Sequence, residues 1–267
     1  MIPKIIHYCW FGGNPLPKLA QKCIKSWKKY CPDYEIIRWD ESNYDIASAP
    51  LYVRQAYEAK KWAFVTDYVR LYAMTTYGGI YMDTDVEVVK PLDQFLHHQA
   101  FSGFERETQI PTGIMACKKG FPLFVEFLRY YDTASFYNAD GSMNMTTNVV
   151  IMTDICLEHG LIQNGQYQEI NGFALYPKDV FCPIRYETGT LHKTKNTATI
   201  HWFTASWKPE HELTERAIMR KNNRQYERKE FWRYMPNRIV RKIFGNKTID
   251  RLKKKLNNFN LFVAKKE

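Results

Sequence analysis

Long apolar runs are absent from this chain of 267 residues. No stretch of about 18 or more apolar residues occurs, so we expect no transmembrane helix. Residues Met1 to Lys4 lead straight into a strand-like run, without the longer apolar region and small-residue cleavage site of a signal peptide. We therefore expect a cytoplasmic protein.

Paired cysteines of the kind that bind zinc are also absent. None of the six cysteines forms a C-x-x-C pair, which argues against a zinc site. A disulfide framework is not expected in a chain of this size and compartment. We predict six buried free thiols, at Cys9, Cys23, Cys31, Cys117, Cys156 and Cys182.

Most of the chain has almost no net charge, although the net charge of the whole is +10. Residues 1–207 hold 20 Lys and Arg against 21 Asp and Glu, whereas residues 208–267 hold 18 against 7. A neutral body with a basic tail indicates a tethering surface and not a basic active site. We predict one domain over 1–207 and a basic helical tail over 208–267.

The tail alternates apolar and basic residues at helical spacing. Leu252, Leu256 and Phe259 interleave with Lys253 and Lys254, among others. This pattern suits an amphipathic helix lying on an anionic membrane surface. An ordinary solvated helix is the alternative interpretation.

Hydrophobic periodicity predicts an α/β fold. Strands over 3–9 and 34–39 flank a helix over 17–30, and such a βαβ opening implies parallel pairing. The clearest helix spans 62–77 and ends at a glycine pair. We also expect strands over 81–89, 99–104, 112–117 and 197–203, helices over 121–132 and 145–159, and a helical pattern from about residue 210.

Two carboxylates one residue apart, Asp83 and Asp85, fall within the predicted strand 81–89. Residues i and i+2 of a strand point to the same side. Two carboxylates on one side can share a hard cation such as Mg²⁺ or Mn²⁺. A solvated turn with two acids is the alternative.

The preceding helix carries Asp67 and Arg70 at i and i+3, on one face. They form either an ordinary intrahelical ion pair or part of a cleft beside the acids. In a cleft, the arginine fork would bind phosphate or sugar hydroxyls, and the aspartate would accept hydrogen bonds from hydroxyls.

These segments together resemble glycosyltransferase family 32, the DXD sugar-binding group. Its core signature is similar to residues 63–73 (AFVTDYVRLYA) and 77–85 (YGGIYMDTD). Residues 2–10 (IPKIIHYCW) resemble the start of the family, and His201-Trp202 with Ser206-Trp207 resembles a late motif. The family includes bacterial capsule and lipooligosaccharide transferases, yeast-type α-mannosyltransferases and, by shared pattern, the glucosylating domains of clostridial toxins.

The resemblance covers about residues 1–207 and implies a GT-A-type, Rossmann-like nucleotide-sugar-binding fold with a mixed central sheet. It implies a nucleotide-sugar donor, a Mn²⁺ or Mg²⁺ cofactor, and retention of anomeric configuration. Asp83 would contact the ribose and donor sugar, and Asp85 would bind the metal. Asp67 and Arg70 would bind the transferred sugar. His201 would lie near the metal and diphosphate, unless it is a core histidine.

Further donor-binding residues follow from the same resemblance. Trp10 would help to form the base pocket, and Tyr81 would lie beside the donor. Ser206 and Trp207 would close over the β-phosphate, although Trp207 can instead be a packing residue. Asn148 is either a donor or acceptor contact or a helix N-terminal cap.

The sequence thus predicts a retaining hexosyltransferase that builds a surface glycan of the capsular or lipopolysaccharide type. We favour a UDP-sugar donor, with GDP-mannose as the alternative. The acceptor would be polyprenyl-linked, and the enzyme would be peripheral on the inner face of the cell membrane. A metal-dependent nuclease lacks support because Glu87 and Lys90 do not give an E-x-K spacing. A non-enzymatic membrane- or nucleic-acid-binding protein stays open, but we expect no nucleic-acid partner.

Overall fold

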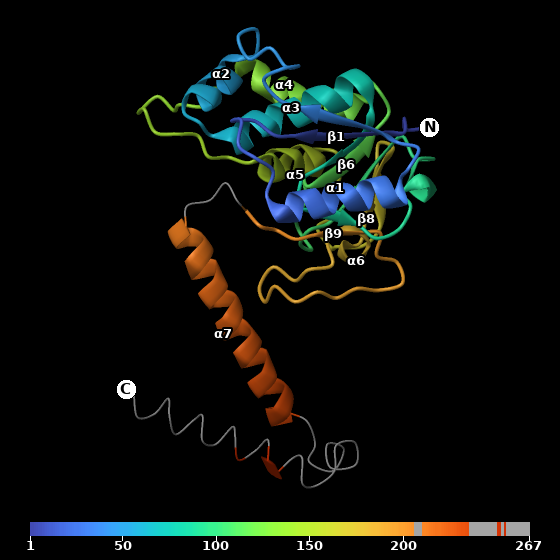
Figure 1. Cartoon of the computed structure of the whole chain (residues 1–267), viewed down its shortest axis with the longest axis vertical. Coiled ribbons are helices and arrows are strands. Elements are labelled where there is room, and N and C mark those ends of the chain that lie inside the picture. The colour runs from blue at the N-terminus through green and yellow to red at the C-terminus, as the bar shows by residue number, and fades with distance from the viewer. Residues whose placement is uncertain (206–209, 235–249, 252–253, 255–267) are drawn as a thin grey trace. The chain divides into compact units, whose positions relative to one another are not determined.

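The computed structural model describes residues 1–205, 210–234, 250–251 and 254 (Figure 1). It divides into two compact units, Met1–Leu213 and Thr214–Glu267. The candidate site lies in the first unit, so the fold of that unit is described first.

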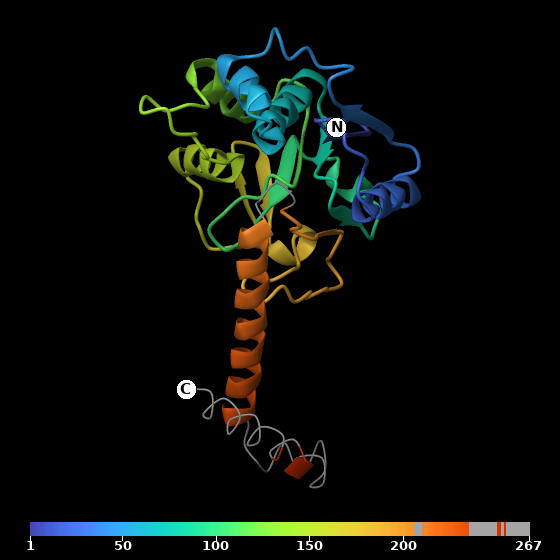
Figure 2. The same ribbon diagram turned by 60° about the vertical axis from the view of Figure 1, so that its left-hand side comes forward.

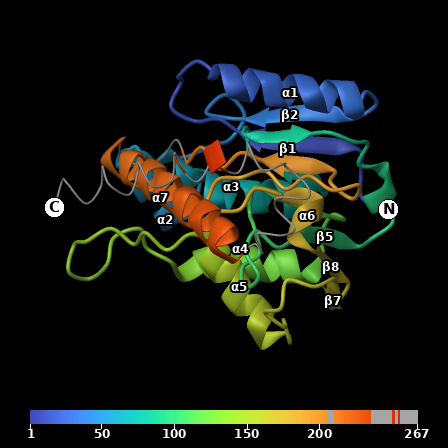
Figure 3. The ribbon, with the colours of Figure 1, turned by 90° about the horizontal axis from the view of Figure 1, so that it is seen from below.

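A mixed seven-stranded sheet forms the centre of the first unit, in the order β2-β1-β3-β6-β5-β8-β7. Figure 3 follows it from β2 and β1 at one side to β8 and β7 at the other. β1 pairs in parallel with β2 and β3, and β5 pairs in parallel with β8; the other pairs are antiparallel. The expected α/β fold with a mixed central sheet is confirmed. The strands are β1 (Ile5–Cys9), β2 (Glu35–Trp39), β3 (Gly79–Met82), β5 (Ala100–Gly103), β6 (Ile114–Cys117), β7 (Gln168–Ile170) and β8 (Phe173–Tyr176).

Helices cover both faces of this sheet, as Figure 2 shows. One face packs against α2 (Leu51–Glu58), α3 (Trp62–Tyr77), α4 (Pro122–Thr133) and α5 (Asn148–Glu158). The other face packs against α1 (Lys18–Tyr30), the 3₁₀ turn η1 (Asp93–Phe95), α6 (Lys178–Phe181) and a small sheet of β4 (Val86–Val88) with β9 (Thr199–His201).

Helix α1 shows why the sequence gives this second layer. Its buried residues Ala20, Cys23 and Trp27 recur at helical spacing, and its remaining face is charged. Trp27 is fully buried and donates its indole N–H to the carbonyl of Val86 at 2.7 Å. One side chain therefore fills the core and fixes α1 to β4, directly beside the acidic turn.

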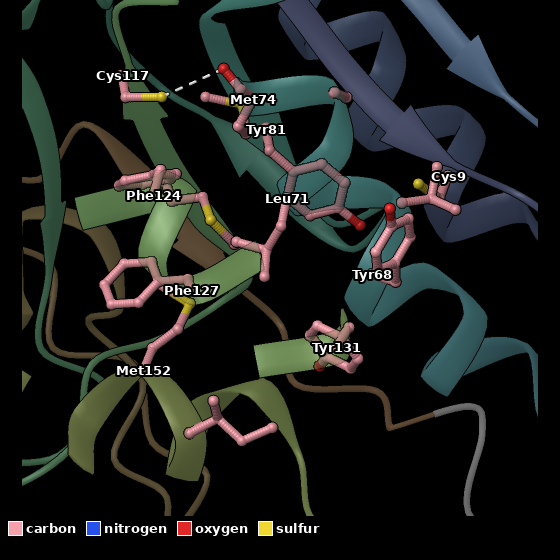
Figure 4. Packing of buried hydrophobic residues seen from close by; sticks show 14 of the residues in the cluster. Cys9, Tyr68, Leu71, Met74, Tyr81, Cys117, Phe124, Phe127, Tyr131 and Met152 are labelled. Carbon is pink, nitrogen blue, oxygen red and sulfur yellow. Dashed lines mark hydrogen bonds between the residues drawn. The ribbon is translucent and has the colours of Figure 1, made fainter. Parts of the chain in front are cut away.

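Helix α3 is buried on most sides because it lies between the sheet and α4. Figure 4 shows Leu71 and Met74 of α3 packed with Tyr81 of β3 and Phe124 of α4. The helix ends at Gly78, whose φ of 71° favours glycine. A Cβ at Gly78 would lie 2.6 Å from the backbone nitrogen of Lys119, so the chain can enter β3 only with glycine here.

One predicted strand is wrong, because the chain is not extended throughout 81–89. β3 ends at Met82 and β4 begins at Val86, so Asp83, Thr84 and Asp85 form a turn. The turn is closed by the amide of Val86, which donates to the carbonyl of Asp83 at 3.0 Å. The prediction that the two acids lie on one side of a strand is therefore wrong.

Other expectations from the sequence are met more closely. All six cysteines are free and buried. The helix predicted over 145–159 begins three residues later, at Asn148. The helical pattern predicted from about residue 210 corresponds to α7 (Glu210–Tyr234), whereas most of the predicted membrane-surface segment lies outside the described residues. Within the described part of the chain, no helix combines the length and apolarity that a membrane crossing requires.

Candidate metal centre and active site

The candidate site lies where β3 ends, at the carboxyl edge of the parallel strands. The turn after β3 supplies Asp83 and Asp85. β9 runs antiparallel to β4 with His201 opposite Val86, and this pairing brings the imidazole beside the turn. One ligand atom from each of Asp83, Asp85 and His201 lies within 4.8 Å of the other two. The two acids therefore lie close together, as the sequence predicted, but a turn and not a strand brings them there.

Asp85 is held by backbone and side-chain groups from β9 and the segment after it. Its Oδ1 lies 3.2 Å from Nε2 of His201. Its Oδ2 accepts hydrogen bonds from the amide and the hydroxyl of Thr204, both at 2.8 Å. Phe203 and Ala205, on either side of Thr204, have φ values of 52° and 50°. Such left-handed backbone is uncommon for non-glycine residues and gathers at functional sites.

The imidazole of His201 is enclosed on two sides. It stacks on the ring of Phe203 with 4.0 Å between centroids. Gly113 lies against its edge, since a Cβ there would come 2.5 Å from Cε1. His201 is 7% exposed, and its Nδ1 has no hydrogen-bond partner among the described residues. The side chain is therefore buried and held in one orientation.

Arg70 joins the helix to the acidic turn. Its Nη2 lies 3.3 Å from Oδ1 of Asp67 and 3.5 Å from Oδ1 of Asp83, and its Nη1 donates to the carbonyl of Thr112 at 3.1 Å. Its guanidinium carbon lies 4.8 Å from the ring centroid of Tyr81, whose hydroxyl donates to Oδ1 of Asp83 at 2.8 Å. The Asp67–Arg70 pair is thus part of the site and more than an ordinary pair on a helix surface.

Asn148, at the start of α5, fixes Asp67 from the other side. Its backbone amide donates to Oδ2 of Asp67 at 3.3 Å, and its side-chain amide donates to the carbonyl of Asp67 at 2.7 Å. The hydroxyl of Tyr131 donates to its Oδ1. The alternative of a helix cap is wrong, because Thr147 holds the N-cap position and Asn148 is the first helical residue.

The other predicted donor-binding residues are placed less fully. Trp10 directly follows β1 and donates its indole N–H to the carbonyl of Asn14 within its own loop, at 2.6 Å. Its part in a base pocket stays a prediction, as does direct contact of the buried Tyr81 with a donor. Ser206 and Trp207 lie outside the described residues.

Residues 17–102 match the family described as the glycosyltransferase sugar-binding region containing the DXD motif. This segment includes Asp67, Arg70 and the turn with both acids. The chain carries a DXD glycosyltransferase domain. The resemblance seen in the sequence is thereby confirmed.

Two curated relatives of this region carry names of mannosyl-transferring enzymes. Inositol phosphoceramide mannosyltransferase 3 of Schizosaccharomyces pombe is 33% identical over 132 residues, which cover 48% of this chain and 36% of that protein. Mannosyl phosphorylinositol ceramide synthase CSH1 of Saccharomyces cerevisiae is 28% identical over 144 residues, which cover 48% and 35%. The chain thus spans about a third of the length of these two relatives. Among solved structures, the PaToxG glycosyltransferase aligns with a TM-score of 0.46 at 19% identity, over 59% of this chain and 68% of that one.

Electrostatics within the glycosyltransferase domain favour a charged Asp85–His201 pair. Burial opposes charge on both groups. The imidazole and the Thr204 donors nevertheless hold the pKa of Asp85 below its usual range, and Asp85 with Cys182 holds the pKa of His201 well above 6.5. Burial raises the pKa of Asp67 to about 6, although Arg70 and the Asn148 amide oppose that shift.

The donor set fits a divalent metal ion. Carboxylate oxygens suit Mg²⁺ and Mn²⁺, and imidazole is a common ligand of transition metals, so two carboxylates with one imidazole favour Mn²⁺. One ligand atom from each of the three side chains lies within 4.8 Å of the other two, which is close enough for them to share one ion. Asp83, Asp85 and His201 would hold the ion, so Asp83 joins Asp85 and His201, which the family resemblance placed at the metal.

Several residues of the site carry no signal in the sequence that we recognised. Thr204 supplies two hydrogen bonds to Asp85, and Gly113 leaves room for the imidazole. Glu105 follows β5; burial raises its pKa, and it interacts electrostatically with His201 and Asp83. In the sequence, Thr204 is an ordinary polar residue three positions after His201, and Gly113 is a glycine directly before β6. Neither belongs to a motif that would identify it.

Proposed function

We propose that this protein transfers a hexose from a nucleotide-sugar to a glycan acceptor with the help of a bound divalent metal. The observation that carries the proposal is the convergence of Asp83, Asp85 and His201 within 4.8 Å, next to the buried Asp67–Arg70 pair. A metal ion held by these three residues would bind the diphosphate of the donor. The adjacent carboxylate of Asp67 and guanidinium of Arg70 would bind sugar hydroxyls.

The chemistry that the residues can support follows from charge. A divalent cation in the site would act as a Lewis acid on the diphosphate leaving group. Arg70 is buried and keeps its positive charge because Tyr81, Asp83 and Asp67 surround it. Its position favours the negative charge that would develop on the diphosphate as this group departs from the sugar. Asn148 would keep Asp67 oriented so that a carboxylate oxygen can accept a hydrogen bond from a sugar hydroxyl.

We infer mannose as the first candidate for the transferred sugar, because the curated relatives are named as mannosyltransferases. GDP-mannose then becomes the donor to test first, ahead of the UDP-sugar that the sequence favoured. Retention of configuration, a polyprenyl-linked acceptor of capsular or lipopolysaccharide type, and a cytoplasmic location at the inner membrane face remain parts of the proposal. The excess of positive charge in the tail supports the location at the inner membrane face. We propose no nucleic-acid partner.

Donor hydrolysis over a panel of GDP- and UDP-sugars tests the proposal. The full chain is incubated with Mn²⁺ or with EDTA, alongside Asp85→Asn and the control Asp154→Asn, which alters an exposed carboxylate on α5. We expect one donor to be hydrolysed only with metal by the wild type and the control, and not by Asp85→Asn. No turnover of any donor, together with no metal-dependent rise in melting temperature with any nucleotide, would refute it.

The tail can be tested separately with vesicles. We expect the full chain to co-float with phosphatidylserine-containing vesicles and not with phosphatidylcholine alone, since each cation near an anionic surface contributes about 1 kcal/mol. Replacing Lys253, Lys254 and Lys255 with alanine should reduce flotation. Equal flotation with both lipids would contradict the electrostatic tether.

A further inference from the structure

Arg106 is a half-buried cation to which the described part of the chain gives no salt-bridge partner. Its Nε is buried and makes no hydrogen bond within those residues. Burying part of a guanidinium removes water from a charged group, and that cost is offset only where an anion or a hydrogen-bond acceptor replaces the water. An arginine held in this way is a candidate for binding an anion from outside the chain.

The ring of Tyr186 holds the guanidinium in place. The Cζ of Arg106 lies 3.9 Å from the centroid of that ring. Tyr186 comes from a hairpin in which the amide of Arg185 donates to the carbonyl of Thr190 at 2.9 Å. Arginine stacks favourably on aromatic faces, and a stacked fork keeps its N–H groups at the edge of the plane. Because Nε is the guanidinium nitrogen that is buried without a partner, the two Nη atoms form the edge that a ligand can reach.

The loop that carries Arg106 also contacts the proposed catalytic residues. It joins β5 to β6. Near its end, the carbonyl of Thr112 accepts a hydrogen bond from Nη1 of Arg70 at 3.1 Å. Gly113, the last residue of the loop, lies against the imidazole of His201. Printed contacts at one end of the loop therefore place Arg106 in a segment that borders the candidate site.

The order of the strands separates Arg106 from the predicted nucleotide pocket. β3, which leads into the acidic turn, lies between β1 and β6, and β5 follows β6 on the far side. Trp10 comes directly after β1, whereas Arg106 comes after β5. A nucleotide bound towards Trp10, as the sequence predicts, leaves the side of Arg106 to the acceptor.

We propose that Arg106, stacked on Tyr186, binds an anionic group of the acceptor, and that this group is a phosphate ester. The inference rests on the transferase activity proposed above and names a class of acceptor for it. The planar fork of arginine matches two oxygens of a phosphate. A phosphate monoester carries about −1.5 to −2 charges at pH 7, more than a carboxylate does. Glu105 lies next to Arg106, but burial raises the pKa of Glu105 and so disfavours its competing negative charge.

The test measures binding of glycerol 3-phosphate to the full chain by isothermal titration calorimetry, with glycerol as the neutral probe. EDTA removes divalent cations that would bind the phosphate themselves, and chloride keeps the ionic strength constant. Arg106→Gln removes the charge, whereas Tyr186→Leu removes the ring and retains the arginine. Arg129→Gln is the matched control, because Arg129 is an exposed arginine on α4.

We expect the wild type to bind glycerol 3-phosphate and not glycerol. Arg106→Gln should weaken binding of the ester by at least about tenfold, since it removes hydrogen bonds between charged groups. Tyr186→Leu should weaken it by a smaller factor, and Arg129→Gln should match the wild type. No binding of the ester to the wild type, wild-type affinity in Arg106→Gln, or an equal loss in Arg129→Gln would overturn the proposal. If Arg106→Gln does not fold, the comparison of Tyr186→Leu with wild type decides.

A second probe identifies the source of the phosphate. Dihexanoylphosphatidic acid, kept monomeric, carries the same ester on a diacylglycerol. Tighter binding of this lipid than of glycerol 3-phosphate, lost in Arg106→Gln, would assign the site to a lipid headgroup, whereas equal affinity would assign it to a soluble phosphate ester.

The donor panel described above separates this inference from the proposed function. Donor hydrolysis without binding of either ester would refute the acceptor site alone. Binding of an ester without turnover of any donor would refute the proposed function and the acceptor role, and would leave an anion site at Arg106.

Discussion

Gly113 offers a test of how His201, the proposed metal ligand, is held. An alanine Cβ at this position would lie 2.5 Å from Cε1 and 2.6 Å from Nδ1 of His201. Ordinary carbon contacts are about 3.5–4.0 Å, so the imidazole must move by about 1 Å. Phe203 stacks on the ring and Asp85 faces Nε2, so the ring cannot move without losing one of these contacts.

The expected effects of Gly113→Ala follow from that displacement. Overpacking of a filled site costs about 1–3 kcal/mol of unfolding free energy. Metal–ligand distances tolerate only about 0.2 Å, so a shift of about 1 Å should remove His201 from the ligand set. We therefore expect both a lower free energy of unfolding and weaker Mn²⁺ binding.

A double-mutant cycle measured by urea unfolding isolates the cause. In a His201→Ala background the clashing ring is absent, so Gly113→Ala should cost close to nothing. Residues in contact typically show coupling energies of about 0.5–3 kcal/mol. An equal loss of stability in both backgrounds would show that the cost arises elsewhere in the backbone and would refute this account of the glycine.

Three further predictions concern the neighbouring charges. Arg70→Met leaves the carboxylates of Asp67 and Asp83 without their buried partner and should lower the free energy of unfolding by about 3–5 kcal/mol, measured by urea titration; a loss below about 1 kcal/mol would contradict the pairing. Tyr81→Phe removes a hydrogen bond to the charged Asp83 and should cost about 1.5–3 kcal/mol in the same assay, whereas an unchanged unfolding midpoint would argue against that bond. Because the pKa of His201 is raised above its unfolded value of 6.5, its stabilising effect in EDTA should be complete below about pH 6.5 and be lost as pH rises through the folded pKa. The melting-temperature difference between wild type and His201→Gln should therefore shrink as pH rises above about 7, whereas a constant difference would mean a neutral imidazole.

Much of the fold could be predicted from local patterns. The periodic apolar residues of α1 and α3, and the glycine pair after α3, identify elements whose type depends on nearby residues. The acidic turn was missed because its flanks, β3 and β4, are both apolar and strand-like. In the fold β3 pairs with β6 and β4 pairs with β9, so the run divides between two sheets whose partner strands are distant in sequence.

The candidate site was predictable as a set of residue types but not as an arrangement. Asp67, Arg70, Asp83 and Asp85 fall within one continuous stretch, so a motif could identify them. Asn148 was ambiguous because its partner, Asp67, is 81 residues away in sequence. Thr204 gave no signal, since its importance depends on the carboxylate of Asp85 that it faces in the folded chain.

The pairing of β4 with β9 has a consequence for the order in which the protein matures. The indole of Trp202 donates to Glu87 across 115 residues, next to the register pair Val86–His201. Closing a flexible loop of that length costs about 4 kcal/mol of chain entropy. During synthesis both acids leave the ribosome long before the histidine does, so the nascent chain cannot complete the ligand set until β9 has emerged and paired. Binding of the proposed metal ion would therefore be a late event in the life of the chain, after β4 and β9 have paired.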